Sequence, residues 1–144
     1  MHTQQFQNTL KRMKQAEEIG KNIKYNLGYS NFTFELWMIL HMADCNGPLS
    51  HRQQYLALLN KAYHEKFESL TQYKQKDNFN KILNKLKLDH VRQAISRSKS
   101  ITKRNMEDPQ CILQQYRGFK YYRENPSLSI WESIEKILKD CSLL

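Results

Sequence analysis

The stretch KQKDNFNKILNKLKLDHVRQAISRSKSITKR, residues 74–104, holds ten of the 23 Lys and Arg side chains of this 144-residue sequence. It contains only two acids, Asp77 and Asp89, so its charge is +8 out of a formal net charge of +9 for the whole sequence. So concentrated a positive field repels itself in the folded state, which indicates a polyanionic partner, and nucleic acid is the first to consider. The alternative interpretation is a Lys-rich solvated face of a helical bundle.

The apolar residues of this stretch predict two short helices joined by a tight turn. The first helix is marked by apolar residues at i, i+3, i+4 and i+7, which are Phe79, Ile82, Leu83 and Leu86. After a break at Leu88-Asp89, the second helix is marked by the stripe Val91, Ala94, Ile95 and Ser98. Two short basic helices with a tight turn between them resemble a helix-turn-helix.

The polar face of the second predicted helix, residues 89–100, is the candidate nucleic-acid-binding site. Arg and Gln side chains can make bidentate contacts to guanine and adenine edges, whereas Ser and Lys contact phosphates. Two further basic residues follow the helix, at positions suited to contact the backbone or the minor groove. The predicted binding residues are Arg92, Gln93, Ser96, Arg97, Lys99, Lys103 and Arg104.

Length and composition predict a single, mainly α-helical domain that spans residues 1–144. A chain of this length buries roughly two-thirds of the surface that its unfolded form exposes. Four glycines and three prolines leave few places for tight hairpins. The three cysteines form no C-x-x-C pair, and no signal peptide or apolar run of about 18 residues is present. We therefore expect a cytoplasmic protein that does not associate with membranes.

Long helices are predicted on both sides of the basic stretch. Apolar periodicity predicts helices over residues 3–25, 34–45 and 51–74, the second of them apolar on nearly all sides and therefore buried. Capping-box patterns at Ser50–Gln53 and Ser129–Glu132 predict the starts of the third and of a last helix. The first and last helices carry apolar stripes at opposite ends of the chain, so we expect them to form a homodimer interface.

Two interpretations of residues 101–124 remain open. In one, a strand at 100–104, a tip at 105–108 and a returning strand at 111–116 form a β-wing. In the other, residues 109–124 are helical, because Asp108-Pro109 is a favoured pair for the N-cap and first position of a helix. The local chemistry slightly favours the helix.

Residue types give little support for catalysis. His41, His51, His64 and His90 are scattered without metal-ligand spacing, and no Gly-rich phosphate loop, G-x-S-x-G or H-E-x-x-H motif is present. We therefore expect no enzymatic activity, no cofactor and no metal. Basic residues near Cys111 in the sequence can lower the pKa of its thiol, as a redox sensor requires, but sequence neighbours are weak evidence for a thiolate.

The segment LGYSNFTFELWMILHMADCNGPLS, residues 27–50, together with the long helix before it, resembles the MarR/SarA-like winged-helix transcription regulators. In those proteins an aromatic residue, a Leu-rich helix and a Gly-Pro-Leu-Ser/Thr turn follow a long first helix in the same order. The resemblance implies a dimer held by terminal helices, a recognition helix in the major groove, and a wing. Arg92, Gln93, Ser96 and Arg97 would then lie on the recognition helix, and residues 103–108 in the wing.

These observations predict a mainly α, winged-helix-like protein with long flanking helices. It would bind nucleic acid, in the first instance duplex DNA, as a non-catalytic regulator of transcription or replication. The alternative function is an all-helical assembly or interaction subunit whose basic strip binds RNA or an acidic protein partner. A helix over residues 109–124 without a hairpin would favour that alternative.

Overall fold

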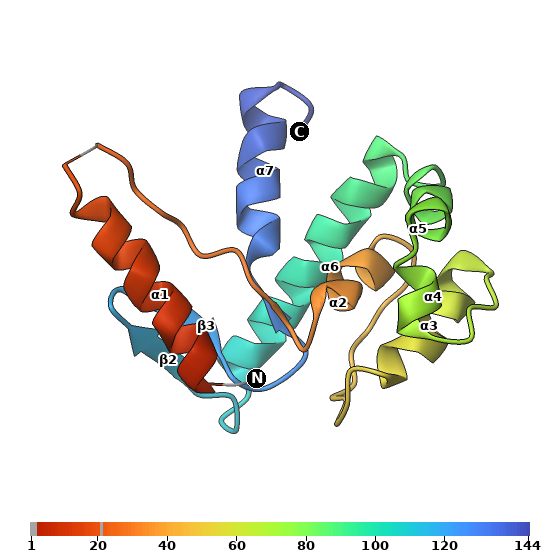
Figure 1. The fold of residues 1–144 in the computed structure, drawn as a ribbon, viewed down its shortest axis with the longest axis horizontal. Helices are drawn as coiled ribbons and strands as arrows, with labels where there is room; N and C mark the ends of the chain where they lie inside the picture. The colour runs from red at the N-terminus through yellow and green to blue at the C-terminus, as the bar shows by residue number, and fades with distance from the viewer. Residues whose placement is uncertain (1–2, 21) are drawn as a thin grey trace.

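The computed structural model describes residues 3–20 and 22–144, and over these residues the chain is mainly α-helical, as predicted, and also contains two small sheets (Figure 1). The helices are α1 (Thr3–Glu17), α2 (Phe34–Leu40), α3 (Gln54–Tyr63), α4 (Leu70–Tyr73), α5 (Lys76–Leu83), α6 (Leu88–Glu107) and α7 (Ile130–Asp140). The strands are β1 (Ser30–Asn31), β2 (Leu113–Tyr116), β3 (Phe119–Tyr122) and β4 (Ser127–Leu128). β1 pairs with β4 and β2 with β3, both antiparallel. None of the described helices is both long and apolar enough to cross a membrane.

The main core is built around α2. Residues 35–40 of this helix are all buried, which confirms the prediction drawn from a sequence that is apolar on nearly every side. The helix is shorter than predicted and ends at Leu40. Helices α3 and α6 pack against α2, and α4, α5 and α7 complete the core.

The longest helix, α6, connects the two ends of the molecule (Figure 1). Its first turn lies beside α5 and its last turn lies beside the β2–β3 hairpin. The predicted pair of basic helices is thus present as α5 and α6, separated by residues 84–87. The second of them continues seven residues beyond its predicted end at Ser100.

A second, smaller core joins α1 to the hairpin. Leu10, Tyr29, Phe119 and Tyr121 are buried in it, and Phe6 and Met13 pack against them. Burial of each such side chain stabilises the fold by roughly 1.5–3 kcal/mol, so α1 is held by its apolar stripe rather than by helix propensity. The stripe of α7 likewise packs on the main core through Ile130, Trp131 and Ile134. Both stripes have partners inside one chain, and the homodimer stays a prediction.

The hairpin turn demands unusual backbone geometry. Arg117 and Gly118 link β2 to β3 with φ values of 50° and 86°. Positive φ at both central residues is typical of the tight turn whose twist matches that of the flanking strands, and glycine adopts it without steric cost.

Several predicted boundaries are wrong. The helix predicted over residues 3–25 ends at Glu17, and residues 22–29 are irregular; Lys21, inside that prediction, lies outside the described residues. The helix predicted over 51–74 is interrupted after Tyr63, where His64 adopts the left-handed conformation. The amide of Asn60 accepts from the Phe67 N–H at 3.0 Å and donates to its carbonyl oxygen at 2.9 Å, which stabilises the interruption.

Residues 100–124 follow neither interpretation as a whole, although β2 lies within the returning strand predicted at 111–116. Residues 100–107, predicted as a strand and wing tip, belong to α6, whereas a hairpin occupies most of the range 109–124 that was predicted to be helical. Asp108 is the C-cap of α6 instead of an N-cap, and its Oδ1 accepts from the Gln110 N–H at 2.9 Å. Burial of Phe119 and Tyr121 against α1 outweighs the local preference for a helix after Asp108-Pro109.

The predicted capping boxes are not formed as expected. Gln54, rather than Gln53, accepts from the backbone N–H groups of Ser50 and His51, at 2.7 and 3.0 Å. Ser129 is the N-cap residue of α7, but its hydroxyl makes no cap bond. It donates instead to the carbonyl oxygen of Leu27 at 2.7 Å, which fixes the chain before β1 against the start of α7.

Candidate nucleic-acid interface

The basic stretch 74–104 is largely neutralised in the folded chain. Seven of its ten basic side chains form ion pairs, and most of their carboxylate partners lie elsewhere in the sequence. The pairs are Lys74–Glu35, Lys81–Glu65, Lys85–Glu65, Arg92–Asp89, Arg97–Asp44, Lys99–Glu135 and Lys103–Glu107. A charge of +8 counted along the sequence is therefore not a field of +8 on one surface.

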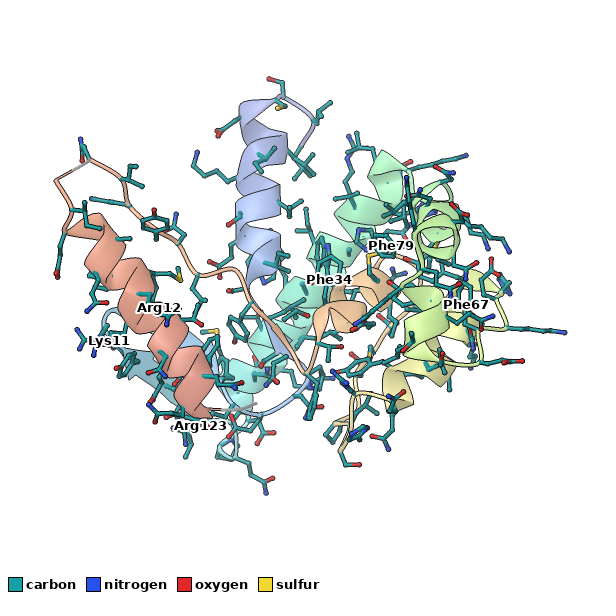
Figure 2. The ribbon with its side chains drawn as sticks, in the orientation of Figure 1. Lys11, Arg12, Phe34, Phe67, Phe79 and Arg123 are labelled. Carbon is teal, nitrogen blue, oxygen red and sulfur yellow. The ribbon has the colours of Figure 1, made fainter. Side chains whose placement is uncertain are left out.

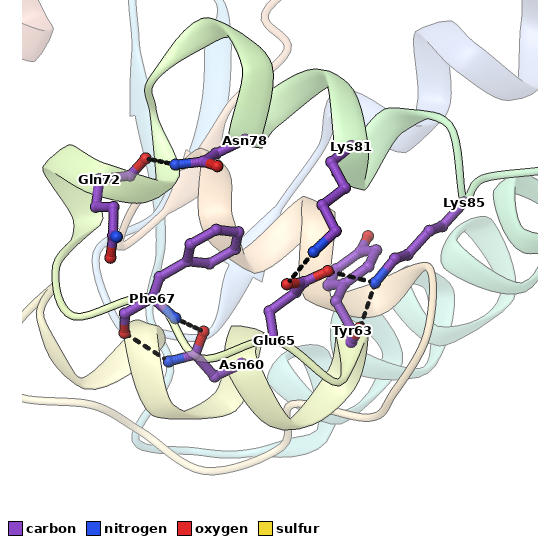
Figure 3. Close-up of polar contacts among 8 residues, drawn as sticks. All are labelled: Asn60, Tyr63, Glu65, Phe67, Gln72, Asn78, Lys81 and Lys85. Carbon is purple, nitrogen blue, oxygen red and sulfur yellow. Dashed lines mark hydrogen bonds and ion pairs between the residues drawn. The ribbon is translucent and has the colours of Figure 1, made fainter.

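The carboxylate of Glu65 shows how this neutralisation also stabilises the fold (Figure 3). Glu65 follows α3, and its side chain is 9% exposed. It accepts from Lys81 Nζ at 2.8 Å and from Lys85 Nζ at 2.5 Å, and Lys85 also donates to the Tyr63 carbonyl oxygen at 2.7 Å. These hydrogen bonds, first from Lys81 and then from Lys85, lower the pKa of Glu65.

We predict that Glu65→Gln lowers the free energy of unfolding at pH 7 by about 1–2 kcal/mol, because it leaves two ammonium groups without their carboxylate. Since the folded-state pKa of Glu65 is lowered, its contribution is complete above the unfolded-state pKa and is lost as pH falls through the folded-state value. The variant and the wild type should therefore converge in urea titrations below about pH 4. Glu68→Gln, at an exposed site, should stay within about 0.5 kcal/mol of the wild type. A difference in the free energy of unfolding between Glu65→Gln and the wild type that stays constant from pH 7 to pH 3 would contradict the prediction.

The predicted reading face of α6 makes contacts within the chain. Arg92 donates from Nη2 to the Leu143 carbonyl oxygen at 2.6 Å, and Lys99 pairs with Glu135 and lies 5.4 Å from the centroid of the Trp131 ring. Arg97 donates to the Leu40 carbonyl oxygen at 2.6 Å, and its Nη2 donates to Gln93 Oε1 at 3.3 Å. Side chains predicted to bind nucleic acid thus connect α6 to α2, α7 and the C-terminal residues.

All seven predicted residues lie on α6, but they differ in how far contacts within the chain engage them. Gln93 and Ser96 are exposed in the middle of α6. Lys103 and Arg104 are exposed in its last two turns, close to the hairpin. A cavity of about 230 Å³ between α6 and the hairpin is lined by Met106 on one side and Lys120 on the other, among other residues, which shows how near the two elements lie.

A basic surface that the sequence did not reveal lies on α1 and the hairpin. We call residues 3–17 and 113–123 the α1–hairpin lobe; it contains six basic residues and one acid, Glu17. Glu17 pairs with Lys14 at 2.6 Å, and this bond lowers its pKa. The other five basic side chains are exposed, and none has a carboxylate partner among the described residues. They are Lys11, Arg12, Arg117, Lys120 and Arg123.

Figure 2 shows Lys11, Arg12 and Arg123 on the same lobe of the molecule. A window moved along the sequence cannot find this cluster, because its two segments are separated by about a hundred residues. Only the packing of Phe6 and Leu10 against the hairpin brings them together. Neither interpretation of residues 101–124 placed Arg117 and Lys120 in one lobe with α1.

The structure offers no support for a redox role of Cys111. Burial raises the pKa of its thiol, and the neighbouring carboxylate of Asp108, 3.8 Å from Sγ, raises it further. This direction is opposite to the lowered pKa that a redox-sensing thiol requires. Among residues 3–20 and 22–144, no group of three or more His, Cys, Asp or Glu side chains is placed to hold a metal ion.

Residues 2–137, nearly the whole chain, match the model of a family described as RloB-like protein. No curated protein and no solved structure matches the chain. The family match overturns the resemblance to MarR/SarA-like winged-helix regulators, which rested on a loose order of aromatic, Leu-rich and Gly-Pro segments in about half of the chain. The protein belongs to the RloB-like protein family.

Proposed function

We propose that the protein binds nucleic acid without catalysis, as a regulator of transcription or replication, and that the α1–hairpin lobe is its main contact surface. The observation that carries this proposal is the cluster of five exposed cations without carboxylate partners among the described residues. Uncompensated positive charge on one surface attracts phosphates, and each phosphate contact releases condensed counterions. Arg104, which has no carboxylate partner among the described residues, and Lys103, which is paired with Glu107 at 3.9 Å, continue this surface along the last turns of α6.

This interface shares only Lys103 and Arg104 with the residues selected from the sequence. The hairpin would act as a wing does, since it follows α6 in the chain and presents Arg117 at its turn. The alternative of an all-helical assembly subunit was tied to a helix over residues 109–124. The hairpin at 113–122 removes that support.

Binding should be steeply salt-dependent. On duplex DNA, four phosphate contacts predict roughly a hundred-fold loss of affinity between about 50 and 200 mM salt, and single strands lose somewhat less. Fluorescence anisotropy with labelled 20-nucleotide DNA and RNA, single-stranded and duplex, measures this directly. No binding to any of them at about 50 mM salt, or an affinity that hardly changes with salt, would contradict the proposal.

Charge reversal locates the interface. Lys11→Glu with Arg12→Glu should weaken binding by at least about ten-fold, because both cations turn into repulsive charges. The matched control is Lys61→Glu with Lys66→Glu, two exposed lysines in and just after α3, also without carboxylate partners among the described residues. An equal loss in both double variants would show that only the net charge matters and that α1 is not the contact surface.

A further inference from the structure

A groove opens beside the α1–hairpin lobe, between α1 and the residues before α3. One wall is formed by Gln5 and Phe6 of α1, and the other by His51 and Arg52; β1 and Phe32 form part of the base. Its volume is about 850 Å³, within the range of roughly 300–1,000 Å³ that is usual for sites holding small organic molecules. The groove therefore has the dimensions to take one or two nucleotide bases.

The lining combines aromatic rings with positive charge. Phe6 and Phe32 are partly exposed, and none of the described residues that line the groove is Asp or Glu. The Arg52 side chain is exposed and has no carboxylate partner within the described chain. His51 Nδ1 accepts from the Gln53 N–H at 3.2 Å, so the neutral ring carries its proton on Nε2 as a donor. Aromatic faces, a cation and polar donors are the groups that single-strand sites offer to bases and phosphates.

The groove is built on fixed elements. The Phe6 ring contacts the Tyr121 ring edge-on at a centroid distance of 4.7 Å and the Tyr29 ring at 6.3 Å. The Tyr29 hydroxyl accepts from the Tyr122 N–H at 3.0 Å, which connects the base of the groove to the hairpin. On the opposite side, the Phe32 N–H donates to the Tyr55 hydroxyl at 3.2 Å. The Phe6 ring and the backbone at Phe32 are therefore held in position before any ligand arrives, which lowers the entropic cost of binding.

We propose that this groove takes one or two unpaired bases of a single-stranded nucleic acid whose phosphates lie on the α1–hairpin lobe and Arg52. The inference rests on the proposed function, because the lobe supplies the contacts to the backbone. In a duplex the faces of the bases are stacked on their neighbours and cannot enter a walled groove, whereas unstacked bases pack on aromatic side chains. The groove thus favours a single strand over the duplex that the sequence suggested.

The test compares three 12-nucleotide ligands: a single strand, its duplex, and an abasic strand with the same backbone. DNA and RNA versions of the single strand show whether the sugar matters. The wild-type protein should bind the single strand at least about ten-fold more tightly than the other two. Equal affinity for the normal and abasic strands would overturn the inference.

Two substitutions distinguish contacts to the bases from contacts to the phosphates. Phe32→Leu should remove most of the preference for the base-bearing strand and leave the abasic affinity unchanged, since it deletes only the aromatic face. Arg52→Ala should weaken both strands and reduce the slope of log K on log salt by about 0.7, the value for one contact to a single strand. The matched controls are Phe34→Leu, at an exposed phenylalanine outside the groove, and Lys61→Ala.

The outcomes distinguish the two proposals. If the Lys11/Arg12 variant loses affinity but neither abasic sites nor Phe32→Leu change binding, the inference about the groove is wrong. The proposal that the α1–hairpin lobe contacts phosphates is then still supported. If no nucleic acid binds the wild type, both fall. If Phe32→Leu lowers Tm, the inference is tested only by comparing how the wild-type protein binds the normal and the abasic strands.

Discussion

Replacing Asn31 with alanine is expected to lower the free energy of unfolding by about 4 kcal/mol, the largest effect of any single substitution proposed for this chain. Asn31 lies in β1 and is 1% exposed. Its Nδ2 donates to the carbonyl oxygens of Arg123 and Glu124, at 2.8 and 3.1 Å, and approaches the Ser127 hydroxyl oxygen at 3.4 Å. Alanine removes the side-chain donor from the part-buried Arg123 carbonyl and one of two donors from the Glu124 carbonyl, and each group left unsatisfied costs roughly 1–3 kcal/mol.

The effect should be large because residues 122–127 depend on side chains for their hydrogen bonds. Ser127 Oγ lies within hydrogen-bond distance of the carbonyl oxygens of Tyr122 and Glu124, and Asn105 Nδ2 donates to that of Pro126 at 2.9 Å. This loop joins the hairpin to β4, so Asn31 connects the two cores.

Urea denaturation followed by circular dichroism measures the change. Asn46→Ala, at an exposed asparagine after α2, is the matched control and should cost less than about 0.5 kcal/mol. A loss below about 1 kcal/mol for Asn31→Ala would mean that water replaces the amide, and that the loop does not rely on it.

The sequence predicted the elements whose evidence is local. The burial of α2 follows from a helix with almost no polar face, and the α5–α6 pair follows from apolar residues spaced at three and four positions. The break after Tyr63 was not predictable in this way. It depends on Asn60 bonding to Phe67, and the apolar stripe continues across it without a gap.

The hairpin and the candidate site depend on contacts distant in the sequence. Phe119 and Tyr121 are buried only because α1 supplies Phe6 and Leu10, so no window around residue 119 contains the reason for its structure. The neutralisation of basic side chains also depends on residues that are distant in the sequence. Seven of the ten basic residues of the stretch 74–104 pair with carboxylates, among them Glu35, Glu65 and Glu135, whereas five cations of the lobe have no carboxylate partner among the described residues.

Replacing Arg97 with alanine is expected to cost about 3 kcal/mol of folding free energy, the second large effect. The Arg97 side chain is 24% exposed; its Nη1 donates to the Leu40 carbonyl oxygen at 2.6 Å, and its Nε lies 3.4 Å from Asp44 Oδ1. Leu40 is the last residue of α2, so Arg97 satisfies a carbonyl that has no partner within the helix and places positive charge at the negative end of the helix dipole.

Arg97→Lys and Arg104→Ala make this prediction specific. Lysine keeps the charge but not the planar set of donors, so Arg97→Lys should recover about half of the loss. Arg104 is exposed on the same helix without a carboxylate partner in the described chain, and Arg104→Ala should change stability by less than about 0.5 kcal/mol.

If Arg97 instead read bases, Arg97→Ala would lower the affinity for a preferred sequence by roughly 1–3 kcal/mol and leave urea denaturation unchanged. That result would show that α6 contacts the nucleic acid. A loss of stability without a change in sequence preference would instead show that Arg97 serves to hold α2 against α6.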